Sequence, residues 1–151
     1  MAKPTNTKTE QEAAVEKDQA EALQKPRYTK DELLIIFDEI LFSGEYREEV
    51  TIKDKFKVTF TTRTAADTAK ITSELDAKKF NLLSSMQEYK ALLCICYSLV
   101  GYNGKDISGM PFDNKKAFIE KLPTVVVAAI SNALVEFDMK TEAAMGEMDS
   151  F

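Results

Sequence analysis

Apolar and polar residues recur along the chain with two different periods, and the longest apolar-dense segment has the helical one. Residues 85–100, SMQEYKALLCICYSLV, carry large apolar side chains three and four positions apart, which predicts a helix. The apolar positions cover most of its circumference, so we expect this helix to be the central and most buried one. Ser85 and Glu88 can form a capping box at its start, and Gly101 follows its last apolar residue as a stop signal.

The period becomes two between residues 48 and 63, which predicts a β-hairpin. Phe56, Val58 and Phe60 fall on one face of the second strand, while lysine and threonine occupy the other. We expect the turn at Asp54 and Lys55. A two-stranded ribbon is marginally stable by itself, so its apolar face must lie on helices or pair with another chain. Its strand edges are therefore candidate contact sites.

Further helices are expected on both sides of these elements. The first follows a capping box formed by Thr29 and Glu32 and ends at Gly44, and its run LLIIFDEILF is apolar enough to be buried on more than one side. The others are expected over residues 65–77, over residues 114–122 and from Pro123 onward. Together these patterns predict an α+β fold, a mostly α-helical single domain with one β-hairpin.

The N-terminal residues 1–28 differ in composition from the rest of the chain. They are rich in Lys, Glu, Gln, Thr and Ala, with few large aliphatic residues. Such a segment buries too little surface to offset its ordering entropy, so we expect a flexible N-terminal arm over residues 1–28, either a plain disordered tail or a segment that a partner orders. The helical domain is expected to span residues 29–142, and residues 143–151 to form a frayed C-terminal tail.

Charge and hydropathy exclude some classes of partner. The chain of 151 residues carries 20 Lys and Arg against 25 Asp and Glu, a net charge of −5, which argues against a nucleic-acid-binding surface. No apolar run is long enough for a membrane span, and the first residues lack the apolar core of a secretion signal. We therefore expect neither nucleic acid nor a membrane as a partner.

The residues that usually carry chemistry are missing or poorly placed. The sequence has no histidine, which removes the commonest general base and metal ligand. Cys94 and Cys96 lie two positions apart in the predicted central helix, so they point in different directions, and apolar burial should raise their pKa. Neither a phosphate-binding glycine loop nor a calcium-loop spacing occurs. We expect no catalytic residue, no cofactor and no metal site, and hence no enzyme.

Three segments taken together resemble small assembly proteins of tailed bacteriophages, specifically tail assembly chaperones and baseplate-hub assembly proteins. The segments are EEVTIKDKFKVTFTTRTAAD, EYKALLCICYSLVGYNGKDI and KKAFIEKLPTVVVAAISNALVEFD. The pattern of that family is a strand pair ending in an Arg-Thr stretch, a helix, an Asn-Gly turn, a FIEKLP helix and a final long helix. Residues 60–64, 98–106 and 118–123 carry the matching pieces, and the similarity covers residues 48–138.

The resemblance implies a non-enzymatic structural or assembly protein of the phage tail or baseplate that acts by protein–protein binding. Its partners would be other tail or virion proteins, with a homo-oligomer as a further option, and it would reside in the host cytoplasm during assembly or in the virion. Phe56, Val58, Phe60 and Arg63 of the predicted ribbon are the candidate partner-binding residues. Two other interpretations stay open: a capsid-associated phage protein with a clasping N-terminal arm, and a helical adaptor domain unrelated to phage.

Overall fold

The computed structural model describes residues 28–149, and the side chains of residues 28–146. The expected flexible arm therefore lies, apart from residue 28, outside the described residues. The chain divides into two units, residues 1–32 and 33–151. In the first unit the expected capping box is present: the Thr29 N–H donates to the Glu32 carboxylate at 3.1 Å, and the Glu32 N–H donates to the Thr29 hydroxyl at 3.2 Å.

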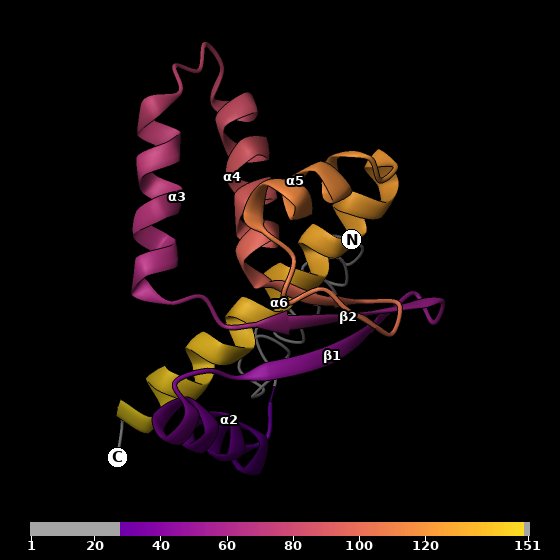
Figure 1. The fold of residues 1–151 in the computed structure, drawn as a ribbon. Coiled ribbons are helices and arrows are strands. Elements are labelled where there is room, and N and C mark those ends of the chain that lie inside the picture. The colour runs from indigo at the N-terminus through magenta and orange to yellow at the C-terminus, as the bar shows by residue number, and fades with distance from the viewer. Residues whose placement is uncertain (1–27, 150–151) are drawn as a thin grey trace, which may run out of the picture. The chain divides into compact units, whose positions relative to one another are not determined.

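Figure 1 shows the helices and strands in the described part of the chain. In chain order they are α2 (Lys30–Ser43), β1 (Arg47–Ile52), β2 (Phe56–Thr61), α3 (Ala65–Ala77), α4 (Leu83–Ser98), β3 (Leu99–Tyr102), β4 (Lys105–Asp106), α5 (Phe112–Glu120) and α6 (Thr124–Asp149). From residue 33 onward the chain forms one mostly helical α+β domain, which confirms the fold class predicted from the sequence.

The strands form one antiparallel sheet in the order β1-β2-β3-β4. The prediction of a single hairpin was incomplete, because β3 pairs with β2 and an Asn103–Gly104 turn returns the chain as β4. Both turn residues have left-handed φ, 53° and 81°, as two-residue hairpin turns require. Gly101, expected to end a helix, is a strand residue, and an added Cβ would lie 2.8 Å from the Thr59 hydroxyl oxygen. Glycine at this position therefore lets β3 pair closely with β2 beside Thr59.

The predicted hairpin forms in the expected place, with β1 and β2 in a continuous antiparallel register. Its turn lies one residue earlier than predicted, because Lys53 and Asp54 adopt left-handed φ angles of 52° and 55°. The Lys55 N–H closes the turn by donating to the Ile52 carbonyl at 3.0 Å. The turn thus forms without glycine, and an aspartate tolerates this backbone region better than most residues.

The predicted central helix is α4, and it occupies residues 83–98 rather than 85–100. The expected capping box of Ser85 and Glu88 does not form, since Leu82 is the N-cap residue and no side chain caps the helix there. Leu93, Ile95 and other C-terminal residues are buried in the core, but the N-terminal half of α4 is mostly exposed. Figure 1 shows this half projecting from the sheet together with α3. The prediction that this helix is buried around most of its circumference therefore holds only for the last turns of α4.

The helix α6 packs on the inner face of the sheet. The Phe137 ring lies 5.7 Å from the Phe60 ring of β2 and is stacked at 5.9 Å on the ring of Tyr46, measured between centroids. The chain was expected to fray from residue 143, and within the described residues α6 continues to Asp149. Ala144 is fully buried, so the helix is packed at that position, within the range that was expected to fray.

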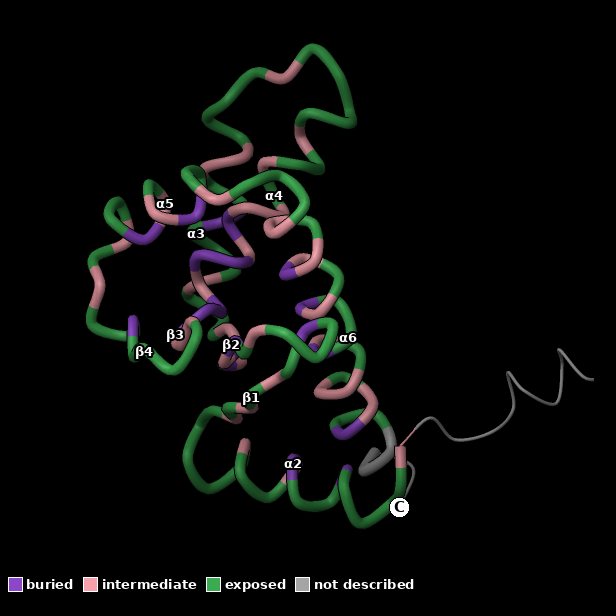
Figure 2. The backbone as a smooth tube through the Cα atoms, turned by 90° about the vertical axis from the view of Figure 1, so that its right-hand side faces the viewer, coloured by how far each residue is buried: buried purple, intermediate pink, exposed green. Residues whose placement is uncertain are grey.

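Burial is uneven among the elements. Figure 2 shows buried residues gathered where α4, α6 and the sheet meet, whereas α2 is exposed along most of its length. The main apolar cluster is built from the inner face of the sheet together with α4, α5 and α6. The helix α2 is therefore unusual, because its sequence is largely apolar and yet most of its residues are exposed.

Candidate functional site

The apolar face of the predicted ribbon is part of the core. Val58 and Phe60 are essentially fully buried, and Phe56 is half-buried with its ring 6.1 Å from that of Tyr102. The sequence left two options for this face, cover by helices or cover by a partner, and the structure gives it to the helices. Val58 and Phe60 are therefore unavailable as a docking surface in the folded domain.

Arg63, the fourth predicted site residue, joins three elements. Its guanidinium donates to the Asp138 carboxylate on α6 and to the Ser98 hydroxyl at the end of α4, both at 2.7 Å. Charge-assisted hydrogen bonds of this length are among the stronger ones in proteins. Arg63 thus acts as a structural tie between the sheet and the helices.

A cleft of about 410 Å³ opens beside Arg63. It lies between α2, the segment after β2, and α6. Its lining residues are Ile40, Gly44, Thr62, Arg63, Thr68, Asp138, Thr141, Glu142 and Met145. Because Arg63 is already paired with Asp138, the cleft presents hydroxyl groups and the Glu142 carboxylate rather than a free cation.

One edge of the sheet is β1, the strand that begins the hairpin, and the other is the two-residue strand β4. The Thr62 N–H donates to the Tyr46 carbonyl at 3.0 Å. Because hydrogen-bonded and non-hydrogen-bonded pairs alternate in an antiparallel ladder, the backbone groups of Arg47, Glu49 and Thr51 point away from β2. Arg47, Glu48 and Glu49 make this edge charged, and charged side chains on an edge strand discourage unspecific pairing with other strands.

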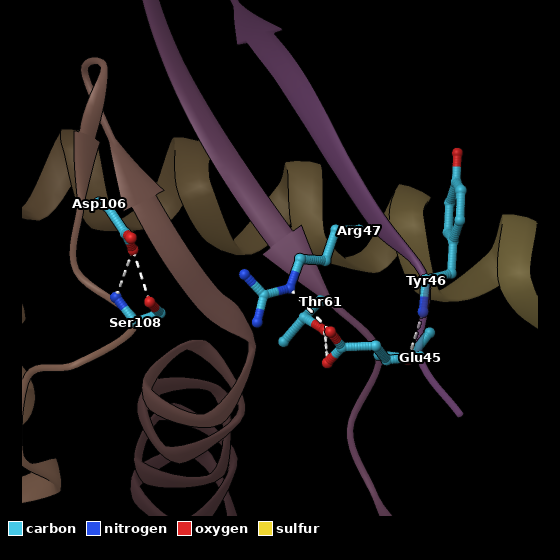
Figure 3. A network of polar contacts seen from close by, with 7 residues as sticks. Glu45, Tyr46, Arg47, Thr61, Asp106 and Ser108 are labelled. Atoms are coloured by element: carbon cyan, nitrogen blue, oxygen red, sulfur yellow. Dashed lines mark hydrogen bonds and ion pairs between the residues drawn. The ribbon is translucent and has the colours of Figure 1, made fainter. Parts of the chain in front are cut away.

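The outer face of the sheet, shown in Figure 3, carries a polar network on the side away from α6. Glu45 accepts from the Arg47 guanidinium at 3.1 Å and from the Thr61 hydroxyl at 3.3 Å. Nearby, the Asp106 carboxylate accepts from the N–H and hydroxyl of Ser108 at 2.9 and 2.6 Å, and these hydrogen bonds lower the pKa of Asp106. The groups satisfy one another, as in a solvated polar surface.

The most unusual surface of the domain is on α2. Four large apolar side chains are exposed there: Leu34 (42%), Ile35 (60%), Leu41 (59%) and Phe42 (87%). We call these four residues the α2 apolar face. The sequence pattern predicted that this run is buried on more than one side, and that prediction was wrong, because Leu33 and Ile36 on the opposite side are the buried residues of the helix. The seven-residue spacing of Leu34 with Leu41 and of Ile35 with Phe42 was the available signal.

Cys94, Cys96 and Lys115 lie on α4 and α5 and differ in how far they are buried. Cys96 is buried, and burial raises the pKa of its thiol to about 11, as the sequence predicted. Cys94 is half-buried and lines a groove of about 200 Å³ between α4 and α6. The Lys115 ammonium is buried and donates to the Leu99 carbonyl at 2.8 Å, and burial lowers its pKa. Lys115 thereby satisfies a carbonyl just after the end of α4.

Two further properties concern the described residues as a whole. Among them, no group of three or more Cys, Asp and Glu side chains is arranged to hold a metal ion. Within the same residues, no helix combines the length and apolarity that a bilayer span needs.

Comparisons with known proteins found no matching family model, no matching curated protein and no matching solved structure.

Proposed function

We propose that this protein acts without turnover chemistry, by binding another protein chain, as a structural or assembly protein of a bacteriophage tail or baseplate. The observation that carries the binding function is the α2 apolar face, with Phe42 exposed over 87% of its surface. Monomeric proteins rarely expose contiguous apolar patches of this kind unless the patch is an interaction site.

The energetics favour a partner at this face. Full burial of one Leu, Ile or Phe side chain is worth roughly 1.5–3 kcal/mol relative to exposure. The four residues of the α2 apolar face are 42–87% exposed, so covering them gains part of this amount for each and can offset some of the cost of association, which is roughly 4–15 kcal/mol.

The support for the narrower assignment, to the phage tail, is the pattern over residues 48–138. The strand pair, the Asn-Gly turn, the short helix α5 and the long helix α6 occur in the order of the resemblance, but the structure has two helices, α3 and α4, and the strand β3 where the resemblance has one helix. In this role the protein works in the host cytoplasm during assembly, and it stays in the virion if it is a structural component.

The test is co-expression with the proteins encoded by the genes that flank its own, followed by affinity capture. The proposal expects tail-tube, tape-measure or baseplate proteins among those neighbours and expects one of them to be retained. The double variant Leu41→Ser, Phe42→Ser should lose that partner. Val125→Ser removes another exposed apolar side chain, at the start of α6, and serves as the matched control that keeps it.

Two outcomes contradict separate parts of the proposal. If the wild-type protein retains none of the neighbouring tail proteins, the tail assignment fails. If a tail protein is retained equally by wild type and by the α2 variant, the assignment survives and the α2 apolar face is not the contact. Mass spectrometry of purified virions then separates a permanent component from an assembly chaperone that leaves.

A further inference from the structure

The α2 apolar face has a regular arrangement around one acidic residue. Successive residues of a helix are separated by about 100°, so Leu34 and Leu41 lie along one line and Ile35 and Phe42 along a second. Asp38 lies between these lines, halfway along the face, and is exposed. The four apolar residues therefore surround a carboxylate, over a length of about 12 Å at 1.5 Å per residue.

The charges around this face have one sign. Between Leu33 and Gly44 the chain carries Asp38 and Glu39 and no lysine or arginine. Both carboxylates are exposed, and in the described part of the chain neither takes part in an ion pair. A partner that covers the face must therefore remove Asp38 from water without help from α2 itself. Burying an unpaired carboxylate is costly, so the partner must supply a cation.

This requirement argues against a second copy of the chain as the occupant. Symmetric dimers use the same surface on both subunits. In a symmetric parallel pair of α2 helices, every residue faces the same residue of the other copy. In a symmetric antiparallel pair whose axis passes through the middle of the α2 apolar face, only the middle residue faces the same residue of the other copy. Because Asp38 is the middle residue, both arrangements place two carboxylates against each other within an apolar interface, and nothing on the face neutralises them.

We infer that the α2 apolar face binds an amphipathic helix of another protein whose apolar stripe carries a lysine or arginine opposite Asp38. The inference rests on the proposed function, since it names the kind of partner that the same surface takes. Helix-on-helix docking fits the seven-residue spacing, because a partner helix presents side chains at three-, four- and seven-residue intervals. Arg is especially suited to the position opposite Asp38, since its guanidinium can bind a carboxylate through two hydrogen bonds.

The test is a selection from a displayed library of helical peptides whose leucine stripe is fixed except at its central position, which is randomised together with the positions beside it. Wild-type protein is the target, and the Leu41→Ser, Phe42→Ser variant removes peptides that bind elsewhere. We expect the surviving peptides to carry Lys or Arg within the stripe. They should bind Asp38→Lys at least about tenfold more weakly, a free-energy change that a single desolvated charge pair can supply. Because the altered side chains are exposed, circular dichroism should show the fold unchanged.

The reverse selection is the matched control. Asp38→Lys used as the target should select peptides with Glu or Asp at the position where wild type selects cations. The inference is overturned if both targets select the same residues at the randomised positions, if no peptide survives the counter-selection, or if sedimentation shows a wild-type dimer that Phe42→Ser dissociates. None of these measurements uses tail proteins, so failure here is distinct from failure of the tail assignment.

Discussion

Arg63 and Asp138 lie 75 positions apart in the sequence, and their side chains meet at 2.7 Å. The contact fixes the chain just after β2 to the middle of α6, and the same guanidinium reaches Ser98 of α4. The residue that the sequence proposed for partner binding therefore holds the sheet and the helices together.

Arg63→Ala should lower the free energy of unfolding by about 1.5–3 kcal/mol, because it leaves hydrogen-bonded polar groups of α4 and α6 without their partner. Urea titration measures this change. Arg47→Ala is the control, since Arg47 forms a solvent-exposed pair with Glu45 and should cost less than about 1 kcal/mol. If Arg63→Ala costs no more than Arg47→Ala, Arg63 has no structural role and is free to serve a partner.

Leu93→Ala should destabilise the domain by about 2–5 kcal/mol, the range for a buried large-to-small change. Leu93 is fully buried in the C-terminal half of α4, whereas Leu83 in the first turn of the same helix is 65% exposed. Leu83→Ala should therefore change stability by less than about 0.5 kcal/mol. Equal losses for the two variants in denaturant titrations would contradict the division of α4 into an exposed and a buried half.

Lys115 and Lys116 are neighbours on α5 and should have opposite effects on the pH dependence of stability. Burial lowers the pKa of Lys115 below 10.5, whereas a hydrogen bond to the Tyr89 hydroxyl raises the pKa of Lys116 above 10.5. Between its lowered folded pKa and 10.5, Lys115 binds protons more tightly in the unfolded chain, so its contribution to stability rises with pH. The contribution of Lys116 is present below 10.5 and is lost as the pH rises through its raised folded pKa.

Unfolding titrations of Lys115→Met and Lys116→Met against pH measure these two contributions. The stability of wild type relative to Lys115→Met should increase as the pH rises toward 10.5. Relative to Lys116→Met it should decrease as the pH rises beyond 10.5. A common slope for both variants would show that the buried position of Lys115 does not perturb its titration.

The two cysteines should differ in reactivity with a maleimide at neutral pH. Cys96 is buried and its pKa is raised to about 11, so little thiolate is present and the reagent cannot reach it. Cys94 lines the groove between α4 and α6 and should be the thiol that reacts in the folded protein. Mass spectrometry should show one label on wild type, none on Cys94→Ser, and two on unfolded wild type. Two labels on the folded protein would contradict this packing.

The sequence predicted several features that local patterns determine, although the capping box of Ser85 and Glu88 and the helix stop at Gly101 were wrong. The hairpin, the capping box of Thr29 and Glu32 and the helix end at Gly44 were all recognised, because turn geometry and caps depend on nearby residues. The Gly44 N–H donates to the Ile40 carbonyl at 2.9 Å with a left-handed φ of 78° at the glycine, as expected at a helix end.

Features set by distant contacts were missed. Leu99 and Val100 were assigned to a helix because they continue its apolar run, yet pairing with β2 makes that segment a strand. The Asn103–Gly104 turn that follows was a hairpin signal. The α2 apolar face was missed for a related reason. Periodicity shows which residues are apolar, but it does not show which of two apolar faces the rest of the domain covers.

The junction between α4 and β3 contains no connecting residue, because Ser98 ends the helix and Leu99 begins the strand. Both residues are held from outside, Ser98 by Arg63 and the Leu99 carbonyl by Lys115 of α5. No loop is available there to absorb a movement. A displacement of α4 along its axis must therefore pull on β3 and, through β2, on the hairpin. Helix and sheet respond to an applied force as one mechanical body, so a load on the projecting end of α4 is transmitted to the edge strand β1.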